Sequence, residues 1–324
     1  MILVTGATGF VGKAIVQRLL ADDESRRVAV AARRVGQQWP ERVLPRVTGE
    51  LTPSADWTVA LEGVSVVIHC AARVHVMTDT AADPLEEFRR VNVQGTLNLA
   101  RQAAAAGVRR FVFVSSVKVN GEATQLGSLF KADDAPAPLD AYGVSKMEAE
   151  QGLRELAAQT GMEVVIIRPP LVYGPGVKAN FAAMMRWLQR GVPLPLGSIH
   201  NQRSLVALDN LVDLIVLCLT HPAAANQTFL VSDGEDVSTS ELLRRMGQAL
   251  DRPARLLPVP QSWLRYAAAM VGKPDVAQRL CGSLQVDITK TRQLLGWTPP
   301  LSLDEGLKRA AAGSLELTNG DTRC

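Results

Sequence analysis

Residues 2–12 read Ile-Leu-Val-Thr-Gly-Ala-Thr-Gly-Phe-Val-Gly, an apolar strand-like run that leads through three spaced glycines into a helical pattern. Gly6 suits a tight turn, Gly9 lets the backbone approach a phosphate closely, and Gly12 permits close packing of helix on strand. The N-terminus of the following helix presents unpaired N–H groups and a positive dipole end to an anion. A glycine-rich turn alone is weak evidence, but a strand, this turn and a helix in that order predict a dinucleotide site.

The first half of the chain alternates short β-rich runs with longer stretches of helical spacing. The short runs are almost continuous Val, Ile, Phe and Ala, as expected for strands buried on both faces. Strands that alternate with helices predict an α/β fold, here a Rossmann-type doubly wound parallel sheet. The expected strands are Ile2–Thr5, Val28–Ala31, Val64–Cys70, Phe111–Ser115 and Val164–Arg168, and the expected helices are Gly12–Ala21, Leu85–Gly107 and Tyr142–Thr160.

The pattern changes after Arg168, where closely spaced prolines break the chain into short pieces typical of an irregular substrate-binding part. We therefore predict a dinucleotide-binding domain over residues 1–168, rejoined by a late strand near 228–232. A smaller, interleaved substrate-binding part is expected over residues 169–312. The small, polar tail over 313–324 is expected to fray.

Bulk composition argues against several classes of protein. The 324 residues are 47% hydrophobic and 21% charged, as in ordinary globular proteins. The net charge of +3 comes from scattered basic pairs rather than a basic stripe, so no nucleic-acid partner is expected. Four dispersed cysteines and four unclustered histidines predict free thiols and no metal site. We find no signal peptide or membrane-spanning run, so we expect a cytoplasmic protein with no membrane partner.

The end of the second strand bears on which dinucleotide binds. An NAD site places Asp or Glu there to accept from the ribose 2′-hydroxyl. Here the strand ends in Arg33 and Arg34, with no acid, and these side chains can pair with a 2′-phosphate. The competing interpretation is a solvated arginine pair. NADP(H) is therefore the preferred cofactor, with NAD(H) as the alternative.

The run Tyr142-Gly-Val-Ser-Lys146 places a phenol and an ammonium one helical turn apart on the same face. This spacing is common and also fits an ordinary helix surface. Its place after a Gly- and Pro-rich loop over residues 119–139, beside the carboxyl edge of the sheet, favours catalysis. A nearby cation favours the phenolate, which makes Tyr142 a candidate general acid/base. Ser116 ends the fourth strand, where its hydroxyl would either hydrogen-bond a reacting oxygen or cap the strand end.

Motifs along nearly the whole chain share their order with one superfamily. They are TGATGFVG from Thr5, His69-Cys-Ala-Ala72, Asn92 within VNVQGT, Ser115-Ser116, Tyr142 with Lys146, Arg168-Pro-Pro-Leu-Val-Tyr-Gly174, Arg203-Ser-Leu-Val and Gly296-Trp-Thr-Pro299. By these motifs the sequence resembles the extended short-chain dehydrogenase/reductase superfamily, in its nucleotide-sugar epimerase/dehydratase branch. A homodimer is usual in that superfamily, so the resemblance implies one here.

The resemblance also implies roles for individual residues. Tyr142 would be the acid/base, Lys146 would bind the nicotinamide ribose and tune Tyr142, and Ser116 would hold the substrate oxygen. Glu50 and Leu51 resemble the family's Asp-Leu that contacts adenine, with Glu in place of Asp. The full set of implied cofactor contacts is Gly6, Thr8, Gly9, Phe10, Val11, Gly12, Arg33, Arg34, Glu50, Leu51, Ala71, Ala72, Asn92, Tyr142, Lys146, Pro169 and Val172.

Substrate contacts follow from the same resemblance. The 4,6-dehydratases of the branch carry an Asp-Glu pair where this chain has Val117 and Lys118, and valine cannot transfer a proton, so dehydration is not expected. Lys118 would either touch a phosphate or substrate oxygen or be a solvated loop lysine. Arg203 would contact a diphosphate, or else form a structural ion pair with a residue such as Asp209. The implied substrate contacts are Ser116, Lys118, Asn180, Arg203 and Arg279.

Two reactions stay open. The missing acid after the second strand and the motifs RSLVALDNLVD and SSVKVNGE favour an NAD(P)H-dependent 4-reductase. Its substrate would be a UDP-linked 4-keto-6-deoxy-N-acetylhexosamine of bacterial surface-polysaccharide synthesis. The alternative is a UDP-hexose or UDP-N-acetylhexosamine 4-epimerase with tightly bound NAD. A non-catalytic redox sensor and a reductase of a non-nucleotide ketone or sterol fit the motifs less well.

Overall fold

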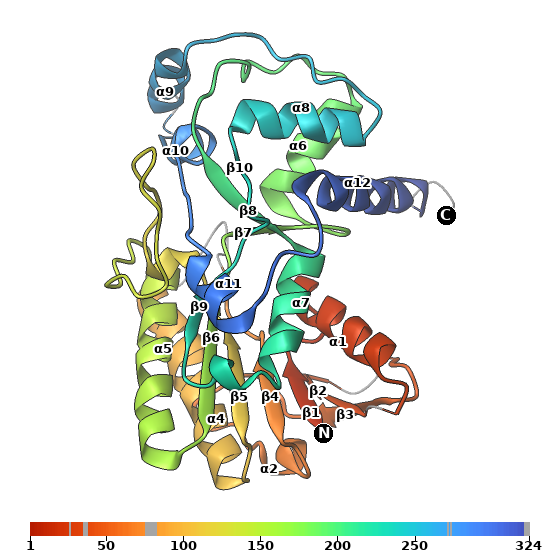
Figure 1. Ribbon diagram of the computed structural model, residues 1–324, viewed down its shortest axis with the longest axis vertical. Helices are drawn as coiled ribbons and strands as arrows, with labels where there is room; N and C mark the ends of the chain where they lie inside the picture. The colour runs from red at the N-terminus through yellow and green to blue at the C-terminus, as the bar shows by residue number, and fades with distance from the viewer. Residues whose placement is uncertain (26, 35–37, 75–82, 271, 273, 321–324) are drawn as a thin grey trace.

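The main sheet has seven parallel strands in the order β3-β2-β1-β4-β5-β6-β9, which confirms the predicted fold class. The computed structural model describes residues 1–25, 27–34, 38–74, 83–270, 272 and 274–320 (Figure 1). The strands are β1 (Ile2–Thr5), β2 (Val28–Ala32), β3 (Val43–Val47), β4 (Val66–His69), β5 (Arg110–Val114), β6 (Glu163–Arg168) and β9 (Thr228–Leu230). Strand β3 was not predicted because Pro45 interrupts its pattern. Among the described residues it pairs only with β2, at the sheet edge, where a proline is tolerated.

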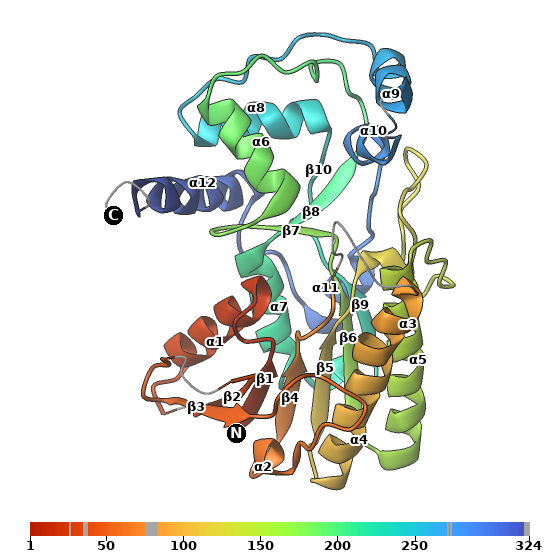
Figure 2. The same cartoon turned by 180° about the vertical axis from the view of Figure 1, so that it is seen from behind.

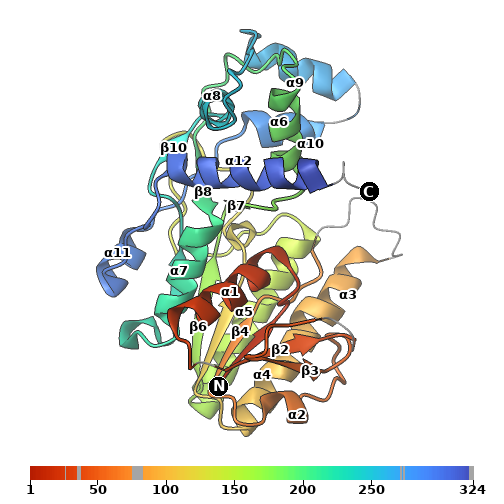
Figure 3. The same ribbon diagram turned by 90° about the vertical axis from the view of Figure 1, so that its right-hand side faces the viewer.

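Helices cover both faces of this sheet (Figure 3). Successive strand residues point to opposite faces, so Val4 packs in one core and its neighbour Leu3 in the other. Helices α1 (Phe10–Asp22), α7 (Leu208–Cys218) and α11 (Thr289–Leu295) contribute to the Val4 side. Helices α2 (Thr58–Leu61), α4 (Thr96–Ala105) and α5 (Ala141–Thr160) contribute to the Leu3 side.

The helix expected over residues 85–107 is present from Pro84 to Ala105, with a π-helical segment in its middle. It consists of α3 (Pro84–Phe88), a π-helical segment η1 (Arg89–Gly95) and then α4. A Cβ added at Gly95 would lie 2.9 Å from Cγ of Leu51, so glycine lets η1 approach the chain that follows β3. The wide π turn also carries Asn92, and such turns recur at functional sites.

A second, smaller part lies beyond the carboxyl ends of the main strands (Figures 1 and 2). It contains a three-stranded sheet of β10 (Asp236–Val237), β8 (Arg203–Ala207) and β7 (Leu171–Tyr173). Around it lie α6 (Ala179–Gln189), α8 (Thr239–Ala249), α9 (Gln261–Met270), α10 (Pro274–Cys281) and α12 (Leu303–Gly320). Its separate core includes Tyr173, Phe181, Leu243 and Leu307.

The chain passes between the two parts more than once. It leaves the main sheet after β6, builds β7 and β8, and returns through α7 to place β9 beside β6. Helix α12 runs to Gly320, so the portion of the predicted tail before residue 321 is helical. Across the part of the chain that the structure describes, no helix is both long and apolar enough to cross a bilayer.

Candidate active site

The glycine turn after β1 brings three backbone segments into contact. Gly6 has a φ of +67°, and a Cβ there would lie 2.8 Å from the backbone nitrogen of Ala71 in the turn after β4. A Cβ at Gly12 would lie 2.2 Å from the carbonyl oxygen of Gly6. Only glycine permits these approaches, so β1, β4 and the start of α1 meet with no side chain between them.

The N-terminus of α1 has the chemistry that a dinucleotide pyrophosphate requires. Within the described residues, no side chain caps this N-terminus and the first turn contains no acid. Thr8 and Gly9 are exposed just before the helix, while Phe10 and Val11 are half-buried. The N–H groups there are free of competing side-chain acceptors, and the helix dipole favours an anion. These residues therefore fit a bound dinucleotide.

The other predicted cofactor contacts follow the carboxyl ends of neighbouring strands. Glu50 and Leu51 come after β3, and Ala71 and Ala72 come after β4. Pro169 directly follows β6, and Val172 lies in β7. Carboxyl ends of parallel strands share one edge, and β1 and β4 are neighbours at the point where the strand order reverses. Ligands of doubly wound sheets bind at this switch point.

Arg33 and Arg34 follow β2 immediately, and both side chains are exposed. This is the place from which a Rossmann fold recognises the adenosine ribose. The described residues there include no acid that would accept from a 2′-hydroxyl. The arginines can reach a ligand without breaking an internal contact.

Lys146 is buried, and contacts with β5 hold its ammonium in place. Its Nζ donates to the carbonyl oxygen of Val114 at 2.9 Å and lies 4.4 Å from the centroid of the Phe113 ring. The same Nζ is 5.9 Å from the centroid of the Tyr142 ring. Burial lowers the pKa of Lys146 to about 8. The ammonium has two further protons to offer to a ligand or to the phenol.

The phenol of Tyr142 is less acidic than the sequence argument implied. Burial raises the pKa of Tyr142, and the negative charge of Asp140 raises it further. The expectation that the nearby Lys146 would by itself favour the phenolate is therefore wrong for the protein alone. Desolvation of the charged form is the larger of the two causes. The ring packs edge-on against Phe88, with centroids 6.0 Å apart.

Ser116 and Lys118 form the turn that faces this helix. The Ser116 hydroxyl oxygen accepts from the backbone nitrogen of Lys118 at 3.2 Å and caps a short 3-10 helix, η2 (Val117–Val119). The Lys118 ammonium pairs with the carboxylates of Asp140 and Glu122. Asp140 in turn caps α5 by accepting from the Gly143 nitrogen at 2.7 Å. Lys118 is thus a member of an ion-pair cluster beside Tyr142 and not a freely solvated lysine.

Asn92 links the turn after β4 to the helix of Tyr142. Its side-chain oxygen accepts from the backbone nitrogen of Arg73 at 2.7 Å, and its Nδ2 donates to the Arg73 carbonyl at 3.0 Å. Nδ2 also donates to the Ser145 hydroxyl at 3.0 Å, and that hydroxyl donates to the Tyr142 carbonyl at 2.8 Å. The buried amide therefore fixes the distance between two walls of the site.

A buried charged group that the sequence argument missed lies behind the site. Glu150 is fully buried and accepts from the Ser115 hydroxyl at 2.6 Å. Arg168 donates to both carboxylate oxygens, with distances of 2.9 and 2.6 Å. The available signal was helical spacing, because Glu150 lies one further turn along the face of Tyr142 and Lys146. Through Glu150, the ends of β5 and β6 are tied to α5.

The structure brings together only some of the residues that were predicted to contact a diphosphate. The Nη1 of Arg203 donates to the carbonyls of Arg279 at 2.9 Å and Gly282 at 3.2 Å, and burial lowers the pKa of Arg203. Asn180 is exposed on a separate element, at the start of α6. Asp209, the example given for an ion-pair partner of Arg203, pairs instead with Arg309 at 3.1 Å.

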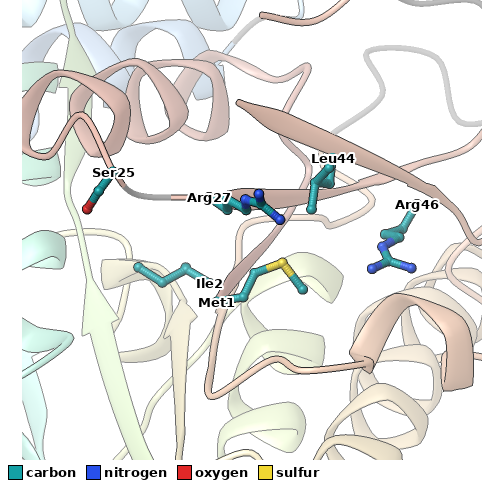
Figure 4. A pocket seen from close by; sticks show the side chains of 6 residues that line it. All are labelled: Met1, Ile2, Ser25, Arg27, Leu44 and Arg46. Atoms are coloured by element: carbon teal, nitrogen blue, oxygen red, sulfur yellow. The ribbon is translucent and has the colours of Figure 1, made fainter. Parts of the chain in front are cut away.

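A cavity of about 300 Å³ adjoins Arg203 through their shared neighbour Gly282. The loop that continues from η2 forms one wall and α9 with α10 forms another; the walls include Thr124, Leu126, Gln261, Arg265 and Gln278. A separate cavity of about 560 Å³ lies at the amino ends of β1, β2 and β3, with Arg27 and Arg46 at its sides (Figure 4). That second cavity is at the end of the sheet opposite the glycine turn.

The chain belongs to the NAD dependent epimerase/dehydratase family, whose profile matches residues 2–232. It is 52% identical to a UDP-glucose 4-epimerase of Vibrio cholerae, over 98% of this chain and 96% of that protein. It is 27% identical to an N-acetyl-alpha-D-glucosaminyl-diphospho-ditrans,octacis-undecaprenol 4-epimerase of Escherichia coli O157:H7, over 95% and 93% of the two chains. Among solved structures, MoeE5 in complex with UDP-glucose and NAD is similar, with a TM-score of 0.76, 26% identity and coverage of 98% and 99%.

These similarities contradict the predicted 4-reductase of a UDP-4-keto-6-deoxy-N-acetylhexosamine. The relative that shares 52% of its residues, across nearly the whole chain, is a 4-epimerase. The prediction rested on the missing acid after β2 and on short motifs. Reductases and epimerases of this kind use the same tyrosine and lysine. The missing acid and the short motifs did not discriminate between the two reactions. The preference for NADP(H) likewise finds no support, since the MoeE5 structure holds NAD.

Proposed function

We propose that this protein is a UDP-hexose 4-epimerase that retains NAD throughout its cycle. The observation that carries the proposal is the 52% identity to the Vibrio cholerae UDP-glucose 4-epimerase over 98% of the chain. The arrangement of Tyr142 and Lys146 at the carboxyl edge of a Rossmann sheet supplies compatible chemistry. When bound, NAD supplies a hydride acceptor that can return the hydride to either face of the resulting ketone.

Tyr142 acts in this proposal as the base that takes the proton of the sugar C4 hydroxyl and later returns it. Because burial and Asp140 raise the pKa of Tyr142, the phenolate needs positive charge around it. Lys146 supplies an ammonium whose Nζ lies 5.9 Å from the ring centroid. Ser116 uses its oxygen to accept from the Lys118 nitrogen, so its hydroxyl proton remains available for the C4 oxygen.

The nucleotide end of the substrate is assigned to the part built from residues 169–312. One guanidinium nitrogen of Arg203 donates to the carbonyls of Arg279 and Gly282. Its remaining donors can serve a diphosphate, as can the exposed side chains of Asn180 and Arg279. The cavity of about 300 Å³ next to Gly282 would take the nucleoside.

The cofactor assignment and the assembly state follow from the family. We assign NAD, held at the glycine turn and along the strand ends described above, with Lys146 on the nicotinamide ribose. Arg33 and Arg34 make NADP the competing ligand, and extraction of the bound dinucleotide distinguishes the two. We also infer a homodimer, formed through the helices over residues 85–107 and 142–160. Sedimentation measures its mass directly.

The decisive experiment incubates the purified protein with UDP-glucose, UDP-galactose or UDP-N-acetylglucosamine, with no added cofactor. NMR should show interconversion of C4 epimers, approaching the same ratio from both directions. Tyr142→Phe should retain the dinucleotide but lose about a hundredfold or more in rate, as expected for removal of a general base. If protein loaded with NAD interconverts none of these pairs, the epimerase proposal is rejected.

A further inference from the structure

The cavity of about 300 Å³ beside Gly282 is lined by groups that can hydrogen-bond but that carry no negative charge. Its described lining includes hydroxyls, side-chain amides, one histidine and one arginine, and none of these residues is Asp or Glu. Ligand cavities typically measure about 300 to 1,000 Å³. This cavity is at the small end of that range, so it suits one nucleoside better than a whole sugar nucleotide.

Helix α9 supplies two of the polar side chains, Gln261 and Arg265. They lie four residues apart, so they project as neighbours from one face of the helix. The Nε2 of Gln261 donates to the carbonyl oxygen of Cys281 at 2.9 Å, which holds this face of α9 against the residue that precedes Gly282. Arg265 lies one helical turn beyond that contact.

The guanidinium of Arg265 faces the cavity and is available to a ligand. Burial raises the pKa of the Cys281 thiol, and the positive charge of Arg265 opposes this rise, so the guanidinium lies near a second lining residue. Arg265 is exposed, and its side chain makes no hydrogen bond or ion pair with any residue that the structure describes. Its N–H groups can therefore serve as donors without breaking an internal contact.

Gln261 complements these donors with an acceptor. Because its Nε2 donates to Cys281, its side-chain oxygen is the group left for a ligand, and no described residue donates to that oxygen. The helix thus offers an acceptor and, one turn further on, a set of donors. The hydrogen-bonding edge of uracil has the matching order, because its N3–H donor is next to the carbonyl oxygen at C4. Cytosine has the reverse order, with an acceptor at N3 and an amino donor at C4.

The loop that follows η2 forms another wall and is fixed to the segment after Gly282. The Thr124 nitrogen donates to the Ser283 carbonyl oxygen at 2.9 Å, and the Thr124 hydroxyl oxygen accepts from the Gln285 nitrogen at 3.2 Å. Figures 1 and 2 both show this loop beside α10. Leu126 of the loop is 68% exposed and lines the same cavity. It offers an apolar contact to the face of a planar base.

We propose that this cavity selects uracil: Arg265 donates to the carbonyl oxygen at C4, and the side-chain oxygen of Gln261 accepts from N3–H. The proposal rests on the UDP-hexose substrate proposed above and names the residues that distinguish its base. Arg203 would hold the diphosphate beside Gly282, where its Nη1 donates to the Gly282 carbonyl at 3.2 Å. Cytosine at the same place would set its amino group against the Arg265 donors and its N3 lone pair against the Gln261 oxygen. Polar groups left unpaired in this way cost binding free energy.

The diphosphate itself would fit less well next to Arg265. Its charged oxygens would face the side-chain oxygen of Gln261, which cannot donate, and the apolar side chain of Leu126. A uracil ring satisfies all three side chains, because it presents a carbonyl oxygen, an N–H group and an apolar face. The lining therefore favours the base over the diphosphate.

The test is calorimetric titration of the full-length, NAD-loaded protein with UDP and with CDP, which share the ribose and the diphosphate. We expect UDP to bind at least about tenfold more tightly than CDP. Arg265→Met should weaken UDP binding about tenfold and should change CDP binding little, so the preference is largely lost. Arg252→Met is the matched control, because Arg252 is exposed in the same part of the molecule but does not line the cavity. It should bind both nucleotides like the parent protein.

An unchanged UDP affinity in Arg265→Met would overturn the proposal, as would a parent protein that does not prefer UDP. An equal loss for UDP and CDP would also overturn it, because Arg265 would then hold the diphosphate. Since the Arg265 side chain is exposed, the variant should melt at nearly the temperature of the parent, which distinguishes lost recognition from misfolding. The titrations involve no turnover. A protein that binds UDP selectively through Arg265 but interconverts no epimers would therefore refute the proposed reaction and leave the uracil site in place.

Discussion

The ammonium of Lys118 pairs with the carboxylate of Asp140, and this contact joins the turn after β5 to the helix that carries Tyr142. Asp140 has two roles at this point. It caps α5 through the Gly143 nitrogen, and its negative charge raises the pKa of Tyr142. Lys118 pairs with the same carboxylate from the turn after β5. We therefore expect Lys118 to act on Tyr142 through Asp140.

Replacing Lys118 with Met should move the pH dependence of the reaction. The positive charge of Lys118 beside Asp140 would be removed, so we expect the pKa of Tyr142 to rise further and the phenolate to form at higher pH. We expect the acidic limb of kcat/KM to shift upward by up to about one pH unit. Asp140→Asn should shift it downward while keeping the cap of α5, because the asparagine side-chain oxygen can accept from the same Gly143 nitrogen.

The matched control for this prediction is Glu122→Gln, which removes the other partner of Lys118 without touching the cap of α5. It should leave the acidic limb close to its original position. A Lys118→Met enzyme with lower activity but an unchanged pH profile would show that Lys118 acts by contact with the substrate and not through Asp140.

Glu150→Gln should destabilise the fold strongly. Glu150 and Arg168 are 0% and 1% exposed, so the variant leaves a buried guanidinium without its counterion. We expect a loss of about 3 kcal/mol or more in the free energy of unfolding, measured by urea titration. Arg154→Met removes a second, exposed partner of Glu150 and should cost less than about 1 kcal/mol. Equal losses in the two variants would contradict this ranking.

Gly12→Ala should abolish dinucleotide binding. The new Cβ would lie 2.2 Å from the Gly6 carbonyl oxygen, so the turn must move away from the helix that receives the pyrophosphate. Bound dinucleotide, extracted and quantified, should fall to a trace while far-UV circular dichroism is largely retained. Gly9→Ala is the milder comparison, since its Cβ would lie 3.1 Å from the same oxygen. Normal cofactor content in Gly12→Ala would refute the proposed role of the turn.

His69 should make the protein sensitive to acid. It is fully buried between Thr5 and Thr96, and burial lowers the pKa of His69 to about 3, from an ordinary value of 6.5. Between these values the unfolded chain binds a proton that the folded protein does not, so stability falls as pH falls. The slope approaches about 1.4 kcal/mol per pH unit. Urea unfolding at several pH values should show this slope in the parent protein and its loss in His69→Phe.

Local patterns made much of the fold predictable. Patterns of only a few residues each predicted the glycine turn and five strands of the main sheet. The structure has strands at the predicted positions. Strand β3 escaped prediction because its pattern contains Pro45 and only its edge position makes that acceptable. The helix over residues 85–107 was predicted, but its π turn was not; the contacts of that turn with Arg73 and Leu51 are distant in sequence.

The site was only partly predictable, for a related reason. Tyr142 and Lys146 are one turn apart, and their place beside the carboxyl edge of the sheet marked this common spacing as a candidate catalytic pair. The partners Lys118 and Asp140 are joined by a loop whose path no periodic pattern reveals. The choice between reductase and epimerase depends on whether the dinucleotide stays bound. Retention of the dinucleotide depends on its binding free energy, which is distributed over many contacts. No single residue in the sequence therefore indicates it.

The return of the chain from β8 through α7 to β9 has a consequence for how the protein can be divided. A fragment ending at Arg168 would lack β9 and would expose β6, whose residues from Val164 onward are buried in the intact protein, as an open edge. Such a fragment should aggregate and should not behave as an independent dinucleotide-binding module. During synthesis the sheet cannot close until residue 230 has emerged from the ribosome. Both halves are therefore expected to unfold together, in a single calorimetric transition.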